Sequence, residues 1–194
     1  MDLDAFADRL IAPSFSSFGY RRRAKSFQPI PRLDGQRVLL TGPTSGIGEA
    51  AARGFDELGA SLVLVGRSPE KLDRLVDELP GDHDTIVADL SLLADAERLV
   101  DRLDPGSLDA VVHNAGAMFD SHARTVEGVE RTLALNLVVP LWITDQLLAR
   151  GLPSTATVVL VSSGGMYSTG PSLRDQRTDE GYRPAVAYAR AKRG

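Results

Sequence analysis

The sequence predicts a three-layer α/β fold in which helices cover both faces of a doubly wound parallel sheet. From residue 36 onward, short apolar runs alternate with longer stretches of helical character, which indicates repeated strand–helix–strand units. The apolar run at 61–65 is continuous, as is typical of a strand covered on both faces. A glycine-rich turn at 41–48 directly follows the first run, where nucleotide-binding sheets place their phosphate loop.

Five strands are expected in chain order, at residues 37–40, 61–65, 85–88, 108–113 and 156–161. The helices expected between them cover 46–58, 69–79, 91–103 and 125–149, and a last helix begins at 185. Breaks rich in Gly and Pro end the helices, and Ser68 and Ser91 are the expected caps of the second and third. The polar stretch 164–184 predicts an irregular excursion.

Residues 1–33 precede this pattern as an N-terminal extension. Apolar residues have helical spacing over 2–12, and basic residues interleave with aromatic ones over 13–27. Pro29 and Pro31 are typical of a linker, so the nucleotide-binding domain is expected to span 34–194. The basic and aromatic stretch is compatible with binding a membrane surface or with packing on the domain. We favour packing, because one short stretch has only marginal membrane affinity.

Composition excludes several classes of function. The 194-residue chain has no cysteine, which excludes disulfides, thiolate metal sites and cysteine nucleophiles. Its net charge of -4 does not favour nucleic-acid binding. His83, His113 and His122 lack metal-ligand spacing, and His113 is expected beside a cofactor instead. We find no apolar run near the roughly 20 residues that cross a membrane and no signal-like N-terminus, and therefore expect a cytoplasmic protein.

The first strand is followed by a turn with the sequence Thr41-Gly42-Pro43-Thr44-Ser45-Gly46-Ile47-Gly48. Gly42 permits a tight turn, Gly46 lets the backbone approach a pyrophosphate, and Gly48 lets the following helix pack near the strand. A phosphate there would meet free N–H groups at the positive end of that helix. The position of the turn favours a Rossmann-type fold over a plain tight loop.

The end of the second strand predicts which dinucleotide is bound. NAD-binding sheets usually place an acidic residue there to hold the ribose 2′-hydroxyl. This chain has Gly66 and Arg67 at that point, and an arginine without an acid favours a 2′-phosphate. We therefore expect NADP(H), and NAD(H) is the open alternative if Arg67 is only a surface residue.

Further motifs follow the later strands. Asp89-Leu90 follows the third strand, His113-Asn114-Ala115-Gly116 the fourth, and Ser162-Ser163-Gly164-Gly165-Met166 the fifth. Asn136 lies in the long helix, and Tyr188-Ala189-Arg190-Ala191-Lys192 lies in the last one. With the glycine turn, these six motifs make the chain resemble the short-chain dehydrogenase/reductase (SDR) family, except that His113 replaces the first of two asparagines.

The resemblance implies cofactor contacts along the whole chain from the glycine turn to the last helix. The implied cofactor-binding residues are Thr41, Gly42, Thr44, Ser45, Gly46, Ile47, Gly48, Arg67, Asp89, Leu90, Asn114, Ala115, Gly116, Tyr188 and Lys192. A closer resemblance is to the subgroup called dehydrogenase/reductase SDR family member twelve and to retinol-dehydrogenase-like members. It rests on Val-Ser-Ser-Gly-Gly-Met, on Tyr-Ala-x-x-Lys-Arg, and on the 25 residues from Ser163 to Tyr188.

The expected catalytic residues are Ser163, Tyr188, Lys192 and Asn136. Tyr188 would exchange a proton with the substrate oxygen. A free tyrosine has a pKa near 10, and the ammonium of Lys192, one helical turn on, would favour the phenolate. The resemblance implies that Lys192 also binds the nicotinamide ribose, that Ser163 orients the substrate oxygen and that Asn136 holds a water behind Lys192. The expected reaction is NADP(H)-dependent interconversion of a carbonyl and an alcohol on small, including lipophilic, molecules.

The resemblance also implies parts that do not follow Lys192 here. The family continues with the rest of the last helix, two further strands and a substrate lid, whereas this chain ends at Gly194. We therefore expect a C-terminally truncated chain that lacks the last strands of the family fold, exposes its fifth strand as an edge and has little or no activity. Related enzymes often pair through the last helix, so the oligomeric state stays open.

Two other interpretations remain open. A non-catalytic NADP-binding regulatory or scaffold protein would keep the glycine turn without using the Tyr-x-x-x-Lys pair. An extended, epimerase-type SDR typically has the spacing Gly-x-x-Gly-x-x-Gly, which Gly42, Gly46 and Gly48 do not have.

Overall fold

The computed structural model describes residues 17–170 and 181–193, and the chain divides into two units, Met1–Pro31 and Arg32–Gly194. The first unit contains helix α3 (Ser17–Ala24), which the sequence did not predict. The helix expected at 2–12 lies outside the described residues. The rings of Tyr20 and Phe27 meet edge-on there, with centroids 6.1 Å apart. Arg32 belongs to the second unit, since its guanidinium donates to the carbonyl oxygen of Glu57 at 3.0 Å.

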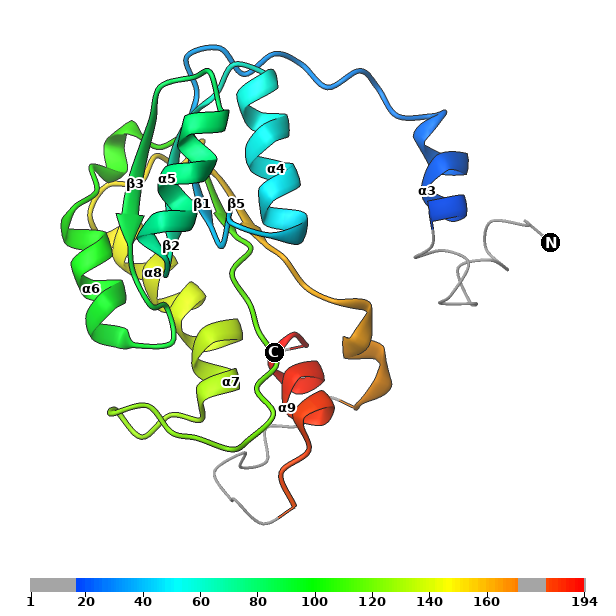
Figure 1. Ribbon diagram of the computed structural model, residues 1–194, viewed down its shortest axis with the longest axis vertical. Coiled ribbons are helices and arrows are strands. Elements are labelled where there is room, and N and C mark those ends of the chain that lie inside the picture. Colours follow the sequence, from blue (N-terminus) through cyan, green and yellow to red (C-terminus); the bar gives the residue numbers. More distant parts are fainter. Residues whose placement is uncertain (1–16, 171–180, 194) are drawn as a thin grey trace. The chain divides into compact units, whose positions relative to one another are not determined.

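The second unit is built on a five-stranded parallel sheet, as the sequence predicts (Figure 1). The strands are β1 (Arg37–Thr41), β2 (Ser61–Gly66), β3 (His83–Val87), β4 (Ala110–His113) and β5 (Thr157–Leu160), in the order β3-β2-β1-β4-β5. All four neighbouring pairs are parallel. The winding direction reverses between β1 and β4, and folds of this kind bind their ligands outside that point.

Helices cover both faces of the sheet and complete three layers (Figure 1). One face packs against α4 (Gly46–Glu57) and α5 (Pro69–Glu78), through core residues such as Val38 and Leu40. The other face packs against α6 (Leu93–Asp101) and a long helix made of α7 (Arg131–Leu133), η2 (Ala134–Val138) and α8 (Val139–Ala149), through residues such as Leu39. Successive residues of β2 also enter opposite cores, Val63 the second and Leu64 the first, which confirms that the strand expected at 61–65 is buried on both faces.

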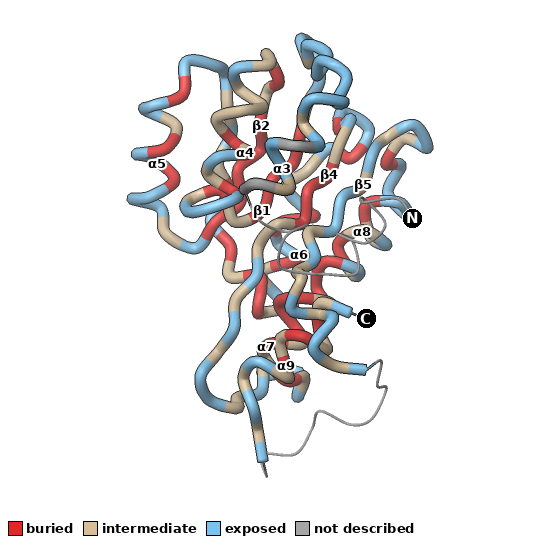
Figure 2. Tube along the Cα trace, turned by 90° about the vertical axis from the view of Figure 1, so that its right-hand side faces the viewer, coloured by how far each residue is buried: buried red, intermediate tan, exposed pale blue. Residues whose placement is uncertain are grey.

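Burial decreases from the centre of the sheet towards β5 (Figure 2). The central strands β1, β2 and β4 are almost wholly buried, whereas Val159 and Leu160 of β5 are 40% and 49% exposed. The described chain places β4 on one side of β5 and no strand on the other, so β5 is an edge. The short turn η1 (Pro105–Ser107) precedes β4 in the chain, and the turn η3 (Gly164–Ser168) and helix α9 (Pro184–Ala191) follow β5.

The third strand begins two residues earlier than expected. His83 and Asp84 are polar and so do not resemble strand residues, yet they pair with Leu62 and Val63 of β2. The imidazole of His83 explains this, because its Nδ1 accepts from the backbone N–H of Leu62 at 3.2 Å while its Nε2 lies 2.8 Å from the Asp56 carboxylate. Side-chain pairing with α4 therefore sets the register of this strand.

Two helix starts predicted from the sequence are wrong. Ser91 does not cap α6, because its hydroxyl donates to the carboxylate of Asp89 at 2.7 Å and the helix begins at Leu93. The long helix begins at Arg131 rather than at 125, because Gly128 has a φ of 81° and turns the chain. Glu130 caps it instead, since its carboxylate accepts from two backbone N–H groups of the first turn at 2.8 and 2.9 Å.

The helical stretch Arg131–Ala149 is long and apolar enough, by length and composition alone, to cross a membrane. The expectation that no such stretch exists is therefore wrong by this measure. In the fold, Ile143 and Leu147 of this stretch are fully buried in the core against the sheet, which accounts for its apolar character.

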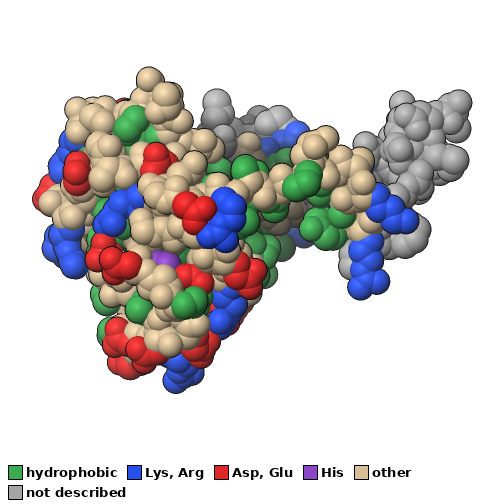
Figure 3. Space-filling view, turned by 90° about the horizontal axis from the view of Figure 1, so that it is seen from above, with side chains coloured by type: hydrophobic (Ala, Val, Ile, Leu, Met, Phe, Trp, Pro, Cys, Tyr) green, Lys and Arg blue, Asp and Glu red, His purple; other side chains and the backbone are tan. Residues whose placement is uncertain are grey.

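On the face of the larger unit shown in Figure 3, acidic and basic side chains are interspersed.

Two adjacent leucines of α8 provide a direct test of this packing. Leu147 is completely buried, whereas Leu148 is 55% exposed. We expect Leu147→Ala to lower the free energy of unfolding by about 2–5 kcal/mol because it leaves a cavity. Leu148→Ala should change it by less than about 0.5 kcal/mol. Urea denaturation of both variants measures this, and equal effects would contradict the assigned face of α8.

Candidate functional site

The carboxyl ends of β1 and β4 are joined by hydrogen bonds through two side chains. The hydroxyl of Thr41 accepts from the backbone N–H groups of Asn114 and Ala115 at 3.1 and 3.0 Å. The amide Nδ2 of Asn114 donates to the carbonyl oxygens of Thr41 and Gly42 at 3.1 and 3.0 Å. These bonds hold the glycine turn against the segment that follows β4, at the point where the winding of the sheet reverses.

The glycines of the turn are required by its geometry. Gly42 has a φ of 67°, and a Cβ there would lie 2.9 Å from Cα of Ala115. A Cβ on Gly48 would overlap the carbonyl oxygen of Gly42, so only glycine allows α4 to start this close to the strand. A Cβ on Gly46 would meet no atom within 4 Å, which leaves open space above a residue whose φ is 56°.

That open space lies at the amino terminus of α4. Ser45 occupies the N-cap position in an extended conformation and makes no hydrogen bond from its side chain to the helix. No side chain of the described residues accepts a hydrogen bond from the first N–H groups of α4, so these groups can bind an anion, favoured by the helix dipole. Thr44 is half-buried, whereas Ser45 and Ile47 are exposed around this turn. These observations fit a dinucleotide pyrophosphate.

The ends of β2 and β3 lie beside this turn in the sheet. Gly66 ends β2, and Arg67 follows it as an exposed residue with no hydrogen bond or ion pair among residues 17–170 and 181–193. Asp89 follows β3, and one of its carboxylate oxygens accepts from the backbone N–H and the hydroxyl of Ser91 at 2.9 and 2.7 Å. Leu90 is buried beneath it. Arg67 is thus free to bind a phosphate, and Asp89 is fixed in a turn.

Asn136 lies on a π-helical turn, η2, and such turns are frequent at functional sites. The first three residues of this turn, 134–136, are buried, and Asn136 itself is only 6% exposed. Its Nδ2 donates to the carbonyl oxygens of Thr132 and Ala117, each at 2.8 Å. Both amide protons are therefore used, and Oδ1 is a buried acceptor without a partner in the described part of the chain.

The side chains of Lys192 and Asn136 both lie against the backbone of Gly116. A Cβ built on Gly116 would lie 2.7 Å from Oδ1 of Asn136 and 3.1 Å from Nζ of Lys192. The ammonium donates to the carbonyl oxygen of Val161 at 2.8 Å, and it lies 6.0 Å from the ring centroid of Tyr188. Burial lowers the pKa of Lys192 below its ordinary value, because the charged form loses hydration. The structure thus brings three of the four expected catalytic residues together.

Ser163 is the fourth, and the structure gives it a local role. It is the N-cap of η3, and its hydroxyl accepts from the backbone N–H of Gly165 at 3.2 Å. Within the described residues, no hydrogen bond joins Ser163 to Tyr188. The neighbouring Ser162, which the sequence analysis did not single out, donates to the carbonyl oxygen of Lys192 at 2.7 Å and ties the end of α9 to the segment after β5.

His113 is buried. Its side chain lies between β4 and α8, and its Nε2 lies 2.9 Å from the hydroxyl of Thr144. The expectation that it lies beside a cofactor stays a prediction. Burial lowers the pKa of His113 to about 4. Among the described residues, no group of three or more His, Asp or Glu side chains is arranged to hold a metal ion.

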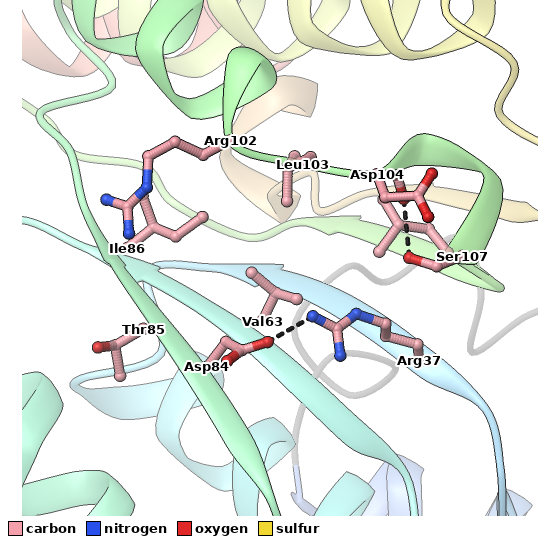
Figure 4. Close-up of a pocket in the computed structure, with 10 residues that line it drawn as sticks. Arg37, Val63, Asp84, Thr85, Ile86, Arg102, Leu103, Asp104 and Ser107 are labelled. Atoms are coloured by element: carbon pink, nitrogen blue, oxygen red, sulfur yellow. Dashed lines mark hydrogen bonds and ion pairs between the residues drawn. The ribbon is translucent and has the colours of Figure 1, made fainter.

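A cavity of about 290 Å³ lies at the opposite end of the strands (Figure 4). Arg37, at the start of β1, forms an ion pair with Asp84 on one side of it, and Arg102 lies on the other side. Because the candidate site residues follow the carboxyl ends of the strands, this cavity is not part of that site.

Comparison with known proteins gives one consistent result. A family model described as short chain dehydrogenase matches residues 36–172. The short-chain dehydrogenase chry4 of Gibberella zeae is 30% identical over 161 residues, which cover 80% of this chain and 60% of that protein. The glucose 1-dehydrogenase of Gluconobacter oxydans is 38% identical over 114 residues, covering 55% of this chain and 43% of that protein.

Solved structures agree. A short-chain dehydrogenase from Sphingobium yanoikuyae in complex with NADPH has a TM-score of 0.62 at 28% identity, covering 81% of this chain and 60% of that one. The chain therefore spans less than two thirds of the length of these relatives. The closer resemblance to one subgroup stays a prediction.

The burial of His113 predicts a pH dependence of stability. Its pKa is about 4 in the folded chain against an ordinary 6.5, so between these values the unfolded chain binds a proton that the folded chain does not. Well above pH 6.5 neither state binds this proton, so it does not change the free energy of unfolding. As the pH decreases from 6.5 towards 4, the free energy of unfolding falls. We expect wild type to lose about 2 kcal/mol more than His113→Gln between pH 7 and pH 5. Urea denaturation at both pH values measures this, and equal losses would contradict it.

Proposed function

Since the chain belongs to the short-chain dehydrogenase/reductase family, we propose that it binds NADP(H) and interconverts a carbonyl and an alcohol. One observation carries the proposal. The segment 114–116 touches the glycine turn at one end, where Ala115 lies against Gly42, and Lys192 and Asn136 at the other, where both lie against Gly116. A single dinucleotide lying along this segment would have its phosphates at α4 and its other end near Lys192 and Tyr188.

The residues at the second end have the chemistry that the reaction needs. NADP(H), when bound, supplies or accepts the hydride. The phenol of Tyr188 would donate a proton to the carbonyl oxygen of the substrate, or accept one from the alcohol in the reverse direction. The ammonium of Lys192 favours the negative charge that a proton transfer leaves on that phenol. Ser163 would orient the substrate oxygen once its hydroxyl turns from its bond to Gly165.

NADP(H) is favoured over NAD(H) by the end of β2. Arg67 is exposed and unpaired among the described residues, and no carboxylate occupies the position that would bind a ribose 2′-hydroxyl. The relative from Sphingobium yanoikuyae was solved with NADPH. We further propose a small-molecule substrate, since the family to which the chain belongs acts on such molecules.

Tyr188→Phe tests the reaction. Loss of the proton donor should lower kcat/KM for NADPH-dependent carbonyl reduction by about 10²- to 10⁴-fold, with the affinity for NADPH unchanged. Tyr182→Phe is the matched control, because that hydroxyl bonds to Thr132 and to the carbonyl oxygen of Phe119. NADPH oxidation with a panel of aldehydes and ketones measures turnover. Equal turnover in wild type and Tyr188→Phe would contradict the role of Tyr188 as proton donor and would favour the non-catalytic alternative.

Arg67→Gln tests the choice of dinucleotide. Loss of a charge-assisted bond to the 2′-phosphate should weaken NADPH binding by about 10- to 100-fold. Binding of NADH, which lacks that phosphate, should change little. Arg74→Gln, in the neighbouring helix α5, is the control for loss of one positive charge. Fluorescence titration with both dinucleotides measures the ratio, and an equal loss for NADPH and NADH would contradict the role of Arg67.

A further inference from the structure

A second cavity, of about 180 Å³, lies behind the catalytic lysine. It is bounded by the ends of β4 and β5, by the π-helical turn η2, by the start of α8 and by the end of α9. Exposed residues such as Leu141, Leu160 and Ser162 line it, so it reaches the surface at the β5 edge. Its titratable groups are His113, Lys192 and Arg193. The cavity has room for several waters, since roughly 10–15 Å³ is enough for one.

The hydrogen bonds of His113 define its tautomer. The hydroxyl of Thr144 donates its single proton to the carbonyl oxygen of Pro140 at 2.9 Å. That hydroxyl can therefore only accept from the imidazole, so Nε2 of His113 carries a proton in the 2.9 Å contact. The low pKa of His113 keeps the ring neutral, and Nδ1 is then an acceptor. It is buried and has no partner in the described chain.

Two residues that line the cavity carry a buried acceptor without a partner in the described part of the chain, and a third carries a donor group with protons to spare. The acceptors are Nδ1 of His113 and Oδ1 of Asn136. The donor is the ammonium of Lys192, of which the bond to Val161 uses one proton out of three. A buried acceptor left unpaired is unfavourable, because it loses its hydration and gains no hydrogen bond in return. Water has the groups that such a set needs, because it has two protons for acceptors and a lone pair for an ammonium.

We propose that His113 is a positioning residue of the catalytic site, whose Nδ1 fixes water in this cavity and through it holds the ammonium of Lys192. The inference rests on the proposed function only in taking Lys192 as the catalytic lysine. Burial disfavours the charged form of Lys192. Water that accepts from Nζ and donates to Nδ1 offsets part of that effect. His113 therefore acts on Tyr188 through Lys192 and does not itself exchange the proton.

The composition of the chain allows the proposal to be tested without turnover. It has three lysines, and Lys25 and Lys71 are exposed, so a chain labelled with ¹³C at lysine Cε gives one buried signal and two internal controls. The pH titration of that signal measures the pKa of Lys192. An enzyme without detectable activity serves equally well, so failure of this proposal is distinct from failure of the proposed function.

Two amides distinguish the two nitrogens of His113. In His113→Asn the amide oxygen can occupy the place of Nδ1, and the contact to Thr144 is lost. In His113→Gln the longer amide can keep the contact to Thr144, and the acceptor at the Nδ1 position is lost. We expect His113→Gln to lower the pKa of Lys192 by about 0.5–1 unit, the value of one hydrogen bond, and His113→Asn to keep the wild-type value. Equal shifts in the two variants, no shift in either, or a shift in His113→Asn alone would overturn the proposal.

A measurement on the unaltered chain applies even if a variant does not fold. The chain has three histidines, so the two ring nitrogens of each are resolved in a long-range ¹H–¹⁵N spectrum. For His113 we expect a protonated Nε2 and an unprotonated Nδ1 whose shift shows an accepted hydrogen bond. A protonated Nδ1, or an Nδ1 with the shift of a bare imidazole nitrogen, would overturn the proposal.

Discussion

The ends of β1 and β4 are held together by four hydrogen bonds that two side chains, Thr41 and Asn114, make to backbone groups. Such bonds contribute about 1 kcal/mol each, but their larger effect is geometric. They close the glycine turn onto Ala115 and thereby fix the course of the next residue, Gly116. The positions of the phosphate end and the lysine end of the site relative to each other follow from this junction.

The lysine end depends on burial as much as on contact. Asn136 is buried on a π-helical turn that interrupts the long helix, and Lys192 lies against the bare backbone of Gly116. Burial removes hydration from both side chains. It lowers the pKa of Lys192, and Oδ1 of Asn136 is buried without a partner among the described residues. The same low-polarity surroundings strengthen the electrostatic effect of an ammonium on a nearby phenol. The features that weaken the fold locally are thus those that suit proton transfer.

The sequence was sufficient to predict the parallel sheet, its three layers and the glycine turn, because each depends on local patterns of apolar and glycine residues. It failed where a distant partner decides the structure. His83 and Asp84 joined β3 through contacts with Asp56 and β2, and Ser91 bonded to Asp89 instead of capping α6. Neither the π-helical turn nor the burial of His113 has a local signal. The sequence motifs also name Asn136, Tyr188 and Lys192, which the structure brings together, but they do not indicate the bond from Ser162 to Lys192.

The central claim is that the glycine turn and Lys192 belong to one dinucleotide site. It is tested most directly by titrating NADPH into the chain labelled with ¹³C at lysine Cε and following the signal of Lys192. The account predicts a saturable shift of that signal, with the same dissociation constant as the change in NADPH fluorescence, while the signal of Lys25 stays in place. Saturation of the fluorescence change with no movement of the Lys192 signal would contradict it.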